Sequence, residues 1–540
     1  MMKSPYIGQW VPGQLHPAFH SQDLLGMLSQ VREPVCIMRR GEDGALGLGV
    51  GGSLDASSAS AGVSGYPAVA VLPAMYPEWL GDRSFLNVHR VRFAYIAGEM
   101  ANGIATTQMV IAMARNGMLG FFGAGGLSPA RIEQAIIEIQ AALDPEGLSW
   151  GINLIHSPNE PLMEEKTVDL FLRRGVVRVS ASAFMGLTPA VVRYACSGLH
   201  LDAAGTILRK HHLFAKVSRP EVAKHFMSPP PARMLEALLA KGLLSEEEVR
   251  LAAHLPLAED ITVESDSGGH TDNRPLAALF PTILGLRNEL MRNFAYTKPI
   301  RVGASGGIGT PTAAAAAFAL GAAYIMTGSV NQSAIESGLS AEGKKMLAAA
   351  DLADVIMAPA GDMFEQGVKV QVLKRGTLFS SRGFKLLELY RAYRSLEDIP
   401  REEILKLEKD VFQEKLEHIW QDTQQFFQNR DPGQIAKAMV DPKHKMALIF
   451  RWYLGKASRW ATEGTEHRRL DYQIWCGPAM GAFNAWVKGT FLEQPDSRTV
   501  VQIALNLLEG AAVITRAQQV RSHGLNVPQE AFAFIPRPLG

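Results

Sequence analysis

Cysteine is scarce in this chain: Cys36, Cys196 and Cys476 are the only three among 540 residues, and no two of them form a CxxC pair. A disulfide framework or a zinc site built on paired cysteines is therefore not indicated. An excess of charge is also lacking, because 54 Lys and Arg are balanced by 53 Asp and Glu. A net charge of +1 creates no field that would recruit nucleic acid or an anionic membrane, so we expect neither as a partner.

The N-terminus and the Ala-rich run lack the apolar length of a signal or a membrane span. Residues 1–10 contain no apolar core of the kind that a secretory signal needs, and unpaired thiols suit a reducing compartment, so we expect a cytoplasmic protein. The Ala-rich run 313–323 is much shorter than the roughly 20 residues of a membrane span and predicts a buried helix. Because no second histidine stands at ligand spacing from His270, we expect no metal site.

From about residue 90 the chain alternates apolar runs with helical patterns, which is typical of β/α units. Eight runs predict strands, the number that closes a parallel barrel: Phe93–Ala97, Met118–Gly123, Trp150–Ile155, Val176–Ala181, Leu213–Val217, Asp260–Val263, Pro299–Val302 and Ala323–Met326. The long connection after the fifth run carries a helical pattern at about residues 225–257. The sequence therefore predicts an α/β fold, a TIM (β/α)8 barrel over residues 88–370 with a helical insert.

The segments before and after the predicted barrel lack its alternation of apolar runs and helical patterns. Residues 1–87 predict an irregular N-terminal extension, with a loop in the small-residue stretch 53–65. Residues 47–51 contain part of a dinucleotide-binding glycine pattern, but no helix follows them, so we expect a turn or a hairpin. Residues 371–540 predict a mainly helical C-terminal domain, because apolar side chains recur there at helical spacing, for example over 401–428 and 499–520.

Glycine-containing turns follow the seventh and eighth predicted strands. Gly306 and Gly307 allow backbone N–H groups to approach an anion closely, because glycine has no Cβ. Gly328 and Ser329 supply further N–H groups and a hydroxyl. The turns after strands seven and eight form the common phosphate site of such barrels, and we predict a phosphate site here.

The loop after the sixth predicted strand carries Gly268, Gly269 and His270. A histidine at a barrel rim can face a ligand and act as an acid or base near neutral pH. The residues alone leave a second interpretation open, in which the histidine holds its own loop through hydrogen bonds to Asp266 or Asp272.

Earlier strand ends add polar groups. Gly98 and Met100 follow the first strand, Asn153 lies in the third and Lys216 in the fifth. A buried asparagine needs a partner for its amide, which either a cofactor ring or a neighbouring side chain would provide. A buried lysine needs an anion or a ring that develops negative charge, and a structural ion pair is the alternative.

These motifs resemble the nitronate monooxygenase/FMN-dependent enoyl reductase superfamily. The resemblance is carried by Gly98-Glu-Met-Ala-Asn102, Gly151-Ile-Asn-Leu-Ile-His-Ser-Pro158, Asp266-Ser-Gly-Gly-His-Thr-Asp-Asn-Arg-Pro275 and Gly306-Gly-Ile-Gly-Thr-Pro311. Three blocks outside the barrel, residues 368–379, 441–446 and 471–480, are similar to the trans-acting enoyl reductases of polyunsaturated fatty acid synthases and trans-acyltransferase polyketide synthases. The resemblance extends over residues 85–525.

The resemblance implies a non-covalently bound FMN and assigns its contacts residue by residue. The phosphate would lie at Gly306, Gly307, Gly328 and Ser329. The ring would be lined by Gly98, Met100, Asn153 and Lys216, with Gly268 and Gly269 beside it, and His270 would be the active-site histidine.

The implied activity is reduction of 2-enoyl thioesters on acyl carrier protein domains of a megasynthase, with NADPH as co-substrate and with NADH left open. The helical C-terminal domain would bind substrate and carrier, and its basic cluster of Lys374, Arg375, Arg382 and Lys385 is either a docking surface or a solvated face. A homodimer is a further expectation. The alternatives are a nitronate monooxygenase that oxidises alkyl nitronates with O₂, and a non-catalytic flavin-binding scaffold.

Overall fold

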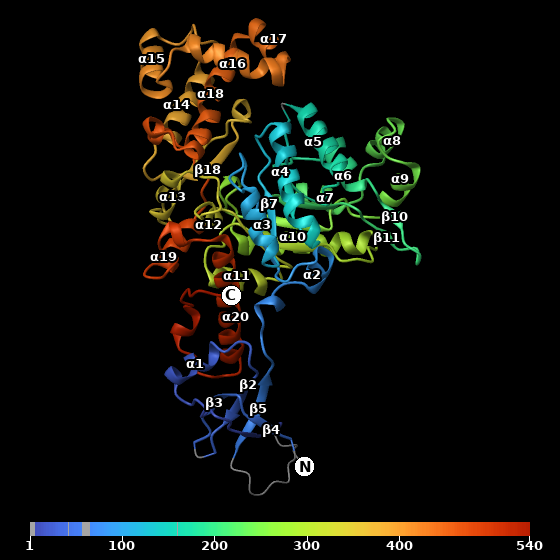
Figure 1. Ribbon diagram of the computed structural model, residues 1–540, viewed down its shortest axis with the longest axis vertical. Helices are drawn as coiled ribbons and strands as arrows, with labels where there is room; N and C mark the ends of the chain where they lie inside the picture. The colour runs from blue at the N-terminus through green and yellow to red at the C-terminus, as the bar shows by residue number, and fades with distance from the viewer. Residues whose placement is uncertain (1–5, 42, 57–64, 159) are drawn as a thin grey trace.

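The computed structural model describes residues 6–41, 43–56, 65–158 and 160–540. Along its longest axis the molecule has three parts, which follow one another from bottom to top in Figure 1. An N-terminal module lies at the bottom, a barrel in the middle, and a helical lobe, residues 355–475, at the top.

Eight parallel strands form a closed barrel, in which each strand pairs with the next barrel strand along the chain. The predicted TIM barrel is therefore confirmed. Its strands are β6 (Tyr95–Ala97), β7 (Leu119–Phe122), β8 (Gly151–Ile155), β9 (Arg178–Ser182), β12 (His212–Val217), β13 (Asp260–Glu264), β15 (Arg301–Ser305) and β16 (Ile325–Thr327). The seventh strand extends past its predicted end through Gly303, where a Cβ would lie only 2.2 Å from the Tyr324 ring. Glycine serves there as a strand residue that makes room for the ring.

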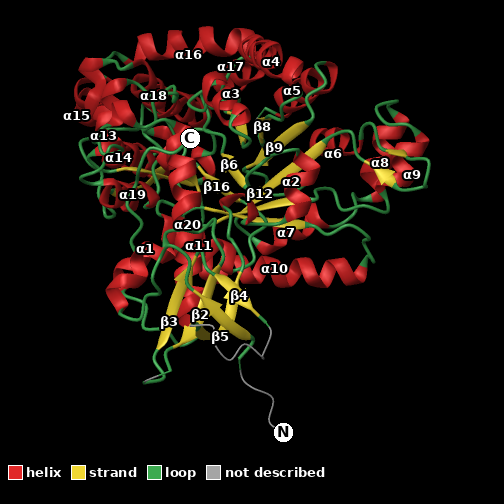
Figure 2. Cartoon of the chain, turned by 60° about the horizontal axis from the view of Figure 1, so that its bottom comes forward, coloured by secondary structure: helices red, strands yellow, loops and turns green. Residues whose placement is uncertain are grey.

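Helices connect the strands and surround the barrel (Figure 2). Side-chain oxygens of Thr106, Ser128, Thr188 and Thr310 cap four of them by accepting a backbone N–H three residues further on. The helices are α2 (Arg83–His89), α3 (Thr107–Arg115), α4 (Pro129–Leu143), α5 (Pro161–Arg173), α6 (Pro189–Cys196), α7 (Pro220–Met227), α10 (Leu276–Asn293), α11 (Pro311–Ala319), α12 (Ser329–Gln332) and α13 (Ala341–Ala348). Between β12 and β13, where the sequence indicates a helical insert, α8 (Ala232–Ala240) and α9 (Glu246–Ala252) follow α7.

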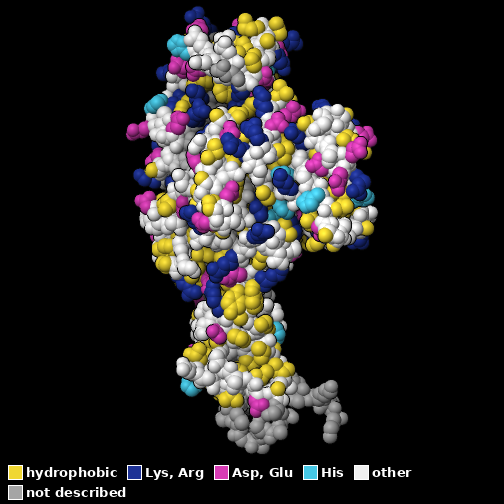
Figure 3. Space-filling view, turned by 45° about the vertical axis from the view of Figure 1, so that its right-hand side comes forward, with side chains coloured by type: hydrophobic (Ala, Val, Ile, Leu, Met, Phe, Trp, Pro, Cys, Tyr) yellow, Lys and Arg dark blue, Asp and Glu magenta, His cyan; other side chains and the backbone are white. Residues whose placement is uncertain are grey.

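The N-terminal module is an antiparallel sheet of five strands and not the irregular extension that the sequence indicates. Its strands are β1 (Gly8–Val11), β2 (Val35–Arg39), β3 (Leu46–Val50), β4 (Ser53–Asp55) and β5 (Tyr66–Leu72), in the order β3-β2-β5-β1-β4, and α1 (Leu24–Leu28) packs beside them. The module projects from the body of the protein as a narrow stalk (Figure 3). Part of the predicted loop at 53–65 lies outside the described residues.

The glycine pattern at 47–51 forms most of β3, which pairs with β2 as a hairpin. Side chains alternate across a strand, so the glycines share one face. A Cβ on Gly47 would lie 2.5 Å from the Phe19 ring, and one on Gly49 would lie 2.6 Å from Trp10. The glycines are needed here because aromatic rings pack against the strand. Their spacing therefore reflects packing and not a nucleotide-binding turn.

The helical lobe has its own hydrophobic core and one antiparallel hairpin. Its elements are β17 (Val355–Pro359), β18 (Lys369–Leu373), α14 (Phe379–Ala392), α15 (Arg401–Lys406), α16 (Leu416–Arg430), α17 (Pro432–Val440) and α18 (Pro442–Glu463). The helical pattern over 401–428 forms two helices, because α15 continues as a π-helical turn, Leu407–Phe412, and ends at Gln413, whose φ of +53° is left-handed. The buried Arg468 donates hydrogen bonds to the carbonyls of Val411 and Phe412 at 3.0 and 2.9 Å and so stabilises the break.

The last two helices, α19 (Ala479–Val487) and α20 (Val500–Ser522), pack into the core of the barrel rather than into that of the lobe. Gly510 lets α20 lie against α11, because a Cβ would be 2.6 Å from Pro311. Among the described helices, α20 alone is long and apolar enough to cross a membrane by length and composition, and 78% of that window is buried within the protein. Residues 371–540 thus contribute to the cores of the lobe and of the barrel, and Ala517 and Val520 near the end of α20 also belong to the core of the N-terminal module.

The floor of the barrel, at the amino ends of its strands, contains buried charges. Asp260 accepts hydrogen bonds from Arg301 at 2.6 and 2.7 Å and lies 3.1 Å from Nε2 of His89. Burial opposes ionisation of Asp260, but Arg301 and His89 outweigh it and lower its pKa. This network lies at the end of the barrel opposite the carboxyl ends of the strands.

Candidate functional site

A pocket of about 910 Å³ opens at the carboxyl ends of the barrel strands and continues beneath the helical lobe. All eleven residues that the sequence analysis selected for the site line it: Gly98, Met100, Asn153, Lys216, Gly268, Gly269, His270, Gly306, Gly307, Gly328 and Ser329. Turns far apart in the sequence meet here because the carboxyl ends of parallel strands lie on one face of a barrel.

The turns after β15 and β16 form one end of the pocket. Gly306 and Gly307 have φ of +84° and +69°, a left-handed conformation that glycine adopts without strain. A Cβ on Gly306 would meet Ser265 at 2.7 Å, whereas a Cβ on Gly307 or Gly328 would meet no atom within 4 Å. Gly307, shortly before the N-terminus of α11, and Gly328, at the N-terminus of α12, therefore face open space, and this arrangement fits a phosphate group.

Lys216 extends from β12 into the pocket between two carboxylates. Its Nζ lies 3.2 Å from Glu99 and 3.2 Å from Glu264. Burial opposes the charge on the ammonium, but the two carboxylates outweigh it and raise the pKa of Lys216. Burial also raises the pKa of Glu264, against the opposing effect of Lys216. The ion pair, one of the two interpretations of this lysine, is present, and it keeps a positive charge in the lining of the pocket.

Polar groups on the barrel side of the pocket are only partly satisfied. Asn153 donates to the carbonyl of Ser180 at 3.1 Å and to Oγ of Ser182 at 2.8 Å, so the neighbouring strand is its partner. Oε2 of Glu99 and Oε1 of Gln332 are buried without a hydrogen bond in the described part of the chain. A ligand that carries N–H or O–H donors would satisfy them, and FMN, with its ring N–H and ribityl hydroxyls, meets this requirement.

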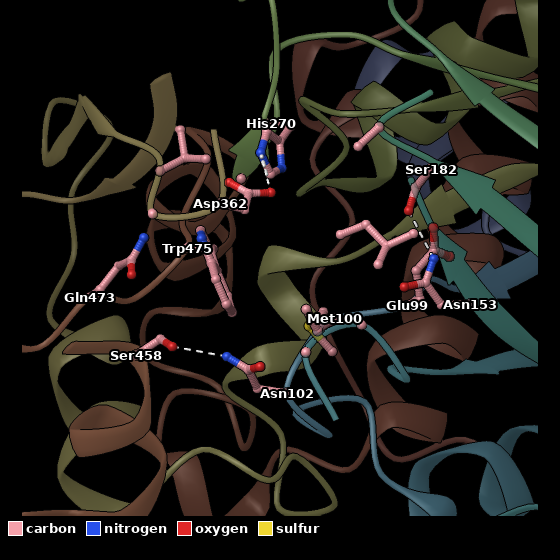
Figure 4. A pocket seen from close by; sticks show the side chains of 18 of the residues that line it. Glu99, Met100, Asn102, Asn153, Ser182, His270, Asp362, Ser458, Gln473 and Trp475 are labelled. Carbon is pink, nitrogen blue, oxygen red and sulfur yellow. Dashed lines mark hydrogen bonds and ion pairs between the residues drawn. The ribbon is translucent and has the colours of Figure 1, made fainter. Parts of the chain in front are cut away.

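His270 lies across the pocket from Glu99 and Asn153 and faces Asp362 of the lobe (Figure 4). Nε2 of His270 is 3.3 Å from Oδ2 of Asp362. Burial disfavours the imidazolium, but the Asp362 carboxylate outweighs this effect and raises the pKa of His270. The histidine is therefore suited to donate a proton or a hydrogen bond near neutral pH.

The helical lobe also holds the loop that carries His270. The short strand β14 (Gly269–His270) pairs antiparallel with β18. Gln371 on β18 donates to Asp266 at 2.7 Å, while Asp272 forms an ion pair with Arg219 at 2.8 Å. The two aspartates that the sequence offered as partners of the histidine thus fix the loop, and the imidazole pairs with the lobe instead.

The segment around Trp475 closes one side of the pocket (Figure 4). A Cβ on Gly268 would lie 2.8 Å from the backbone nitrogen of Cys476, so this glycine permits two chain segments to pack closely. Asn102 at the barrel rim donates to Ser458 of α18 at 2.9 Å and joins the barrel to the lobe. Gly268 lines the pocket, but its missing Cβ serves packing.

Asp362 and Trp475 are site residues that the sequence analysis missed. Asp362 follows β17 in a Gly-Asp turn, a pattern too common to indicate a partner for a histidine 92 positions away. Trp475 belongs to the block 471–480, whose resemblance to enoyl reductases marked the segment without giving the residue a role. Among the described residues there is no group of three or more His, Cys, Asp or Glu side chains that would hold a metal ion.

The basic cluster at 374–385 lies outside the pocket lining. Three of its four members form ion pairs: Arg375 with Asp354, Arg382 with the buried Asp471, and Lys385 with Glu403. Arg382 therefore contributes to the packing of the lobe, whereas Arg375 and Lys385 are about half exposed, and a docking role for the cluster stays a prediction.

Comparison with known proteins identifies the class of this barrel. Residues 84–385 match the family model described as nitronate monooxygenase, and residues 393–472 match the one described as the inserted helical domain of acyl-carrier-protein S-malonyltransferase. The chain belongs to the nitronate monooxygenase family. Within that family it is related to enoyl reductases, because a solved enoyl reductase domain and proteins of polyunsaturated fatty acid and polyketide biosynthesis are similar to it over most of its length.

One of these relatives belongs to the polyunsaturated fatty acid synthase of Thraustochytrium sp. (strain ATCC 26185 / S-3). This synthase polypeptide is 48% identical over 85% of the present chain and 31% of its own length. Polyketide biosynthesis protein PksE of Bacillus subtilis (strain 168) is 46% identical over 81% of this chain and 56% of that protein. The chain therefore spans only 31% and 56% of the length of these two relatives.

A crystal structure of the enoyl reductase domain of MlnA, from the macrolactin biosynthesis cluster of Bacillus amyloliquefaciens, is similar over most of the chain. The two are 38% identical with a TM-score of 0.78, over 82% of this chain and 99% of that domain. The similarity extends beyond the barrel, and it supports an oxidoreductase.

Proposed function

We propose that the protein reduces 2-enoyl thioesters carried on acyl carrier protein domains, with NADPH as the electron donor and FMN as the cofactor, in polyunsaturated fatty acid or polyketide biosynthesis. The observation that carries the proposal is the pair His270–Asp362 at the rim of a pocket whose other end is a glycine-lined phosphate cradle. The similarity to an enoyl reductase domain supports the same reaction.

Bound FMN would supply hydride transfer from the nicotinamide to the β-carbon of the enoyl group. The backbone of Gly306, Gly307 and Gly328 would hold its phosphate. The Lys216 ammonium, held between Glu99 and Glu264, would offer a hydrogen-bond donor to the bound group in this part of the lining.

In this proposal His270 acts as the acid. Its imidazolium, stabilised by Asp362, would donate a hydrogen bond to the thioester carbonyl or a proton to the α-carbon as negative charge develops there. The lobe forms this side of the pocket, which Gly361, Asp362, Gln473 and Trp475 line.

The second candidate is a nitronate monooxygenase, which the name of the matching family favours. The two activities differ in their electron donor. Under anaerobic conditions NADPH should bleach the bound flavin, and an enoyl thioester such as crotonyl-pantetheine should restore its absorbance over many turnovers. Oxidation of an alkyl nitronate by O₂ without NADPH, together with no response to the thioester, would establish the monooxygenase instead. A flavin that NADPH reduces but no thioester reoxidises would indicate a scaffold.

Gly328→Asp is expected to weaken FMN binding strongly. The φ of Gly328, −124°, lies outside the left-handed region, and the new side chain would point into open space at the predicted phosphate site. Two like charges about 4 Å apart repel by about 4 kcal/mol at an effective dielectric constant of about 20, so we expect the Kd for FMN to rise about 10²-fold or more. Fluorescence titration measures this Kd, and Gly328→Ala is the control that should still bind. If Gly328→Asp were purified with a full complement of FMN, the assignment of this turn to the FMN phosphate would be contradicted.

Asp362→Asn is expected to move the pH profile of reduction to lower pH. Burial lowers the pKa of His270 and the Asp362 carboxylate raises it most, so removing that charge leaves only the smaller effect of Glu264 to oppose burial. If the protonated imidazole is the active form, the rate falls as pH rises through its pKa, and in the variant this fall occurs at lower pH. The measurement is kcat/KM against pH with a small enoyl thioester. An unchanged pH profile would show that Asp362 does not raise the pKa of His270.

A further inference from the structure

The pocket extends well beyond the barrel mouth, along one face of α18. The residues of α18 that line this outer part include Trp452, Gly455, Lys456, Arg459 and Glu463. Their spacing of three and four residues places them in one stripe of the helix. Residues on the other side of α18, such as Tyr453 and Ala457, are fully buried in the core of the lobe. The stripe is therefore the helix face that α18 presents to a ligand in the outer pocket.

Gly455 leaves a gap in the middle of this stripe. A glycine inside a helix costs about 1 kcal/mol relative to alanine, and no close packing requires it here, because a Cβ would meet no atom within 4 Å. The residue is exposed and lines the pocket. Its effect is to keep a groove open on α18, in line with Ser458, which contacts the barrel rim.

Lys456 and Arg459 flank the groove, one helical turn apart. Their nearest carboxylates are distant for ion pairs: Asp422 lies 3.8 Å from Lys456, and Glu463 lies 3.9 Å from Arg459. Neither cation donates a hydrogen bond within the described part of the chain, and both carboxylates are more than half exposed. Two adjacent cations with such weak internal partners suit an anionic group of a ligand.

The other cations of the outer pocket are engaged with the protein. Arg430 donates to both carboxylate oxygens of Glu160 at 2.8 to 3.1 Å. Arg451 donates to the carbonyl of Gly361 at 2.9 Å and lies 3.3 Å from Glu365. Lys456 and Arg459 are thus the cations of this lining with the loosest internal ion pairs.

We propose that Lys456 and Arg459 bind the phosphate ester of the phosphopantetheine arm that carries the enoyl thioester. The arm lies in the groove at Gly455, and its thioester reaches the part of the same pocket that holds His270. This inference rests on the proposed function. The phosphates of the nicotinamide dinucleotide share the same chemistry, and a comparison of substrates with and without the pantetheine phosphate separates the two sources.

The test is the double variant Lys456→Gln/Arg459→Gln, which removes both charges from an exposed helix face. Crotonyl-phosphopantetheine and crotonyl-pantetheine, which differ only in the phosphate, are compared as substrates. The KM for the phosphorylated thioester should rise about tenfold or more, because hydrogen bonds to charged groups contribute strongly to binding. The KM for the unphosphorylated thioester, the KM for NADPH and kcat with each substrate should stay within about twofold of those of the wild-type protein.

The matched control is Lys374→Gln/Arg375→Gln, which makes the same change of charge on the lobe but outside the pocket. It should leave the KM of both thioesters unchanged. An equal rise for both thioesters in the pocket variant, a rise confined to NADPH, or no change at all would each overturn the inference. If the wild-type protein reduced neither thioester, the proposed function itself would fail, so the two failures are distinguishable.

Discussion

His270→Ala is expected to lower kcat for reduction of crotonyl-pantetheine by about 10²-fold or more, the usual effect of losing a positioned acid or base. The imidazole faces the pocket and pairs with Asp362 at 3.3 Å, while its loop is held by other groups. The variant should therefore fold and bind FMN as the wild-type protein does. Stopped-flow absorbance of the flavin would locate the loss in the step that consumes the thioester, with reduction by NADPH little changed.

His200→Ala is a suitable control for this variant, because His200 is exposed on the short strand β10 (His200–Leu201) and outside the pocket lining. Its kinetic constants should match those of the wild-type protein. If His270→Ala turned over at the wild-type rate with its FMN bound, the role of His270 as acid would have to be abandoned. Slow reduction of the flavin by NADPH in that variant would instead assign the histidine to nicotinamide binding.

Asp260→Ala is expected to lower the free energy of unfolding by about 3–5 kcal/mol, the cost of removing one partner from a buried ion pair. Arg301 is only 3% exposed and would lose both of its short hydrogen bonds, while His89 would lose the carboxylate beside it. Urea denaturation followed by circular dichroism measures the change. Because these residues lie at the end of the barrel away from the pocket, FMN binding by the folded variant should be little affected.

The exposed ion pair between Arg115 and Glu146 provides a matched control, with an N–O distance of 2.9 Å. Glu146→Ala should change stability by no more than about 1 kcal/mol, because water replaces the lost partner. Adding Arg301→Met to Asp260→Ala should recover part of the loss, because it removes the unpaired buried charge. Equal stability of Asp260→Ala and the wild-type protein would show that the network at the barrel floor contributes nothing.

The barrel and the components of its pocket could be predicted because their signals are local. A buried parallel strand needs a short apolar run, and a turn that approaches an anion needs glycine, so both leave marks in consecutive residues. The eight strands and the turns at Gly306, Gly307 and Gly328 were found in this way. The N-terminal sheet was missed because glycines and small residues, usual in loops, serve in β3 to accommodate Phe19 and Trp10.

The partner of His270 could not be predicted, because it comes from a different core. Asp266 and Asp272 are near in sequence, whereas Asp362 reaches the imidazole only after β18 pairs with β14. The same holds for the helix break at Leu407–Phe412, which depends on Arg468 some sixty residues further on. Contacts between distant segments depend on how separately folded parts pack, and no local pattern encodes them.

The sequence by itself therefore determined the barrel, the order of its strands, and the set of residues that meet at their carboxyl ends, since the closure of eight parallel strands brings those ends together. Only the tertiary structure decided which charged groups become partners in the pocket. It places Asp362 beside His270, gives Lys216 its two carboxylates, and leaves Lys456 and Arg459 with the weakest partners of the outer pocket. The physical reason is that the charge state of a buried group depends on its neighbours in space, whatever their distance along the chain.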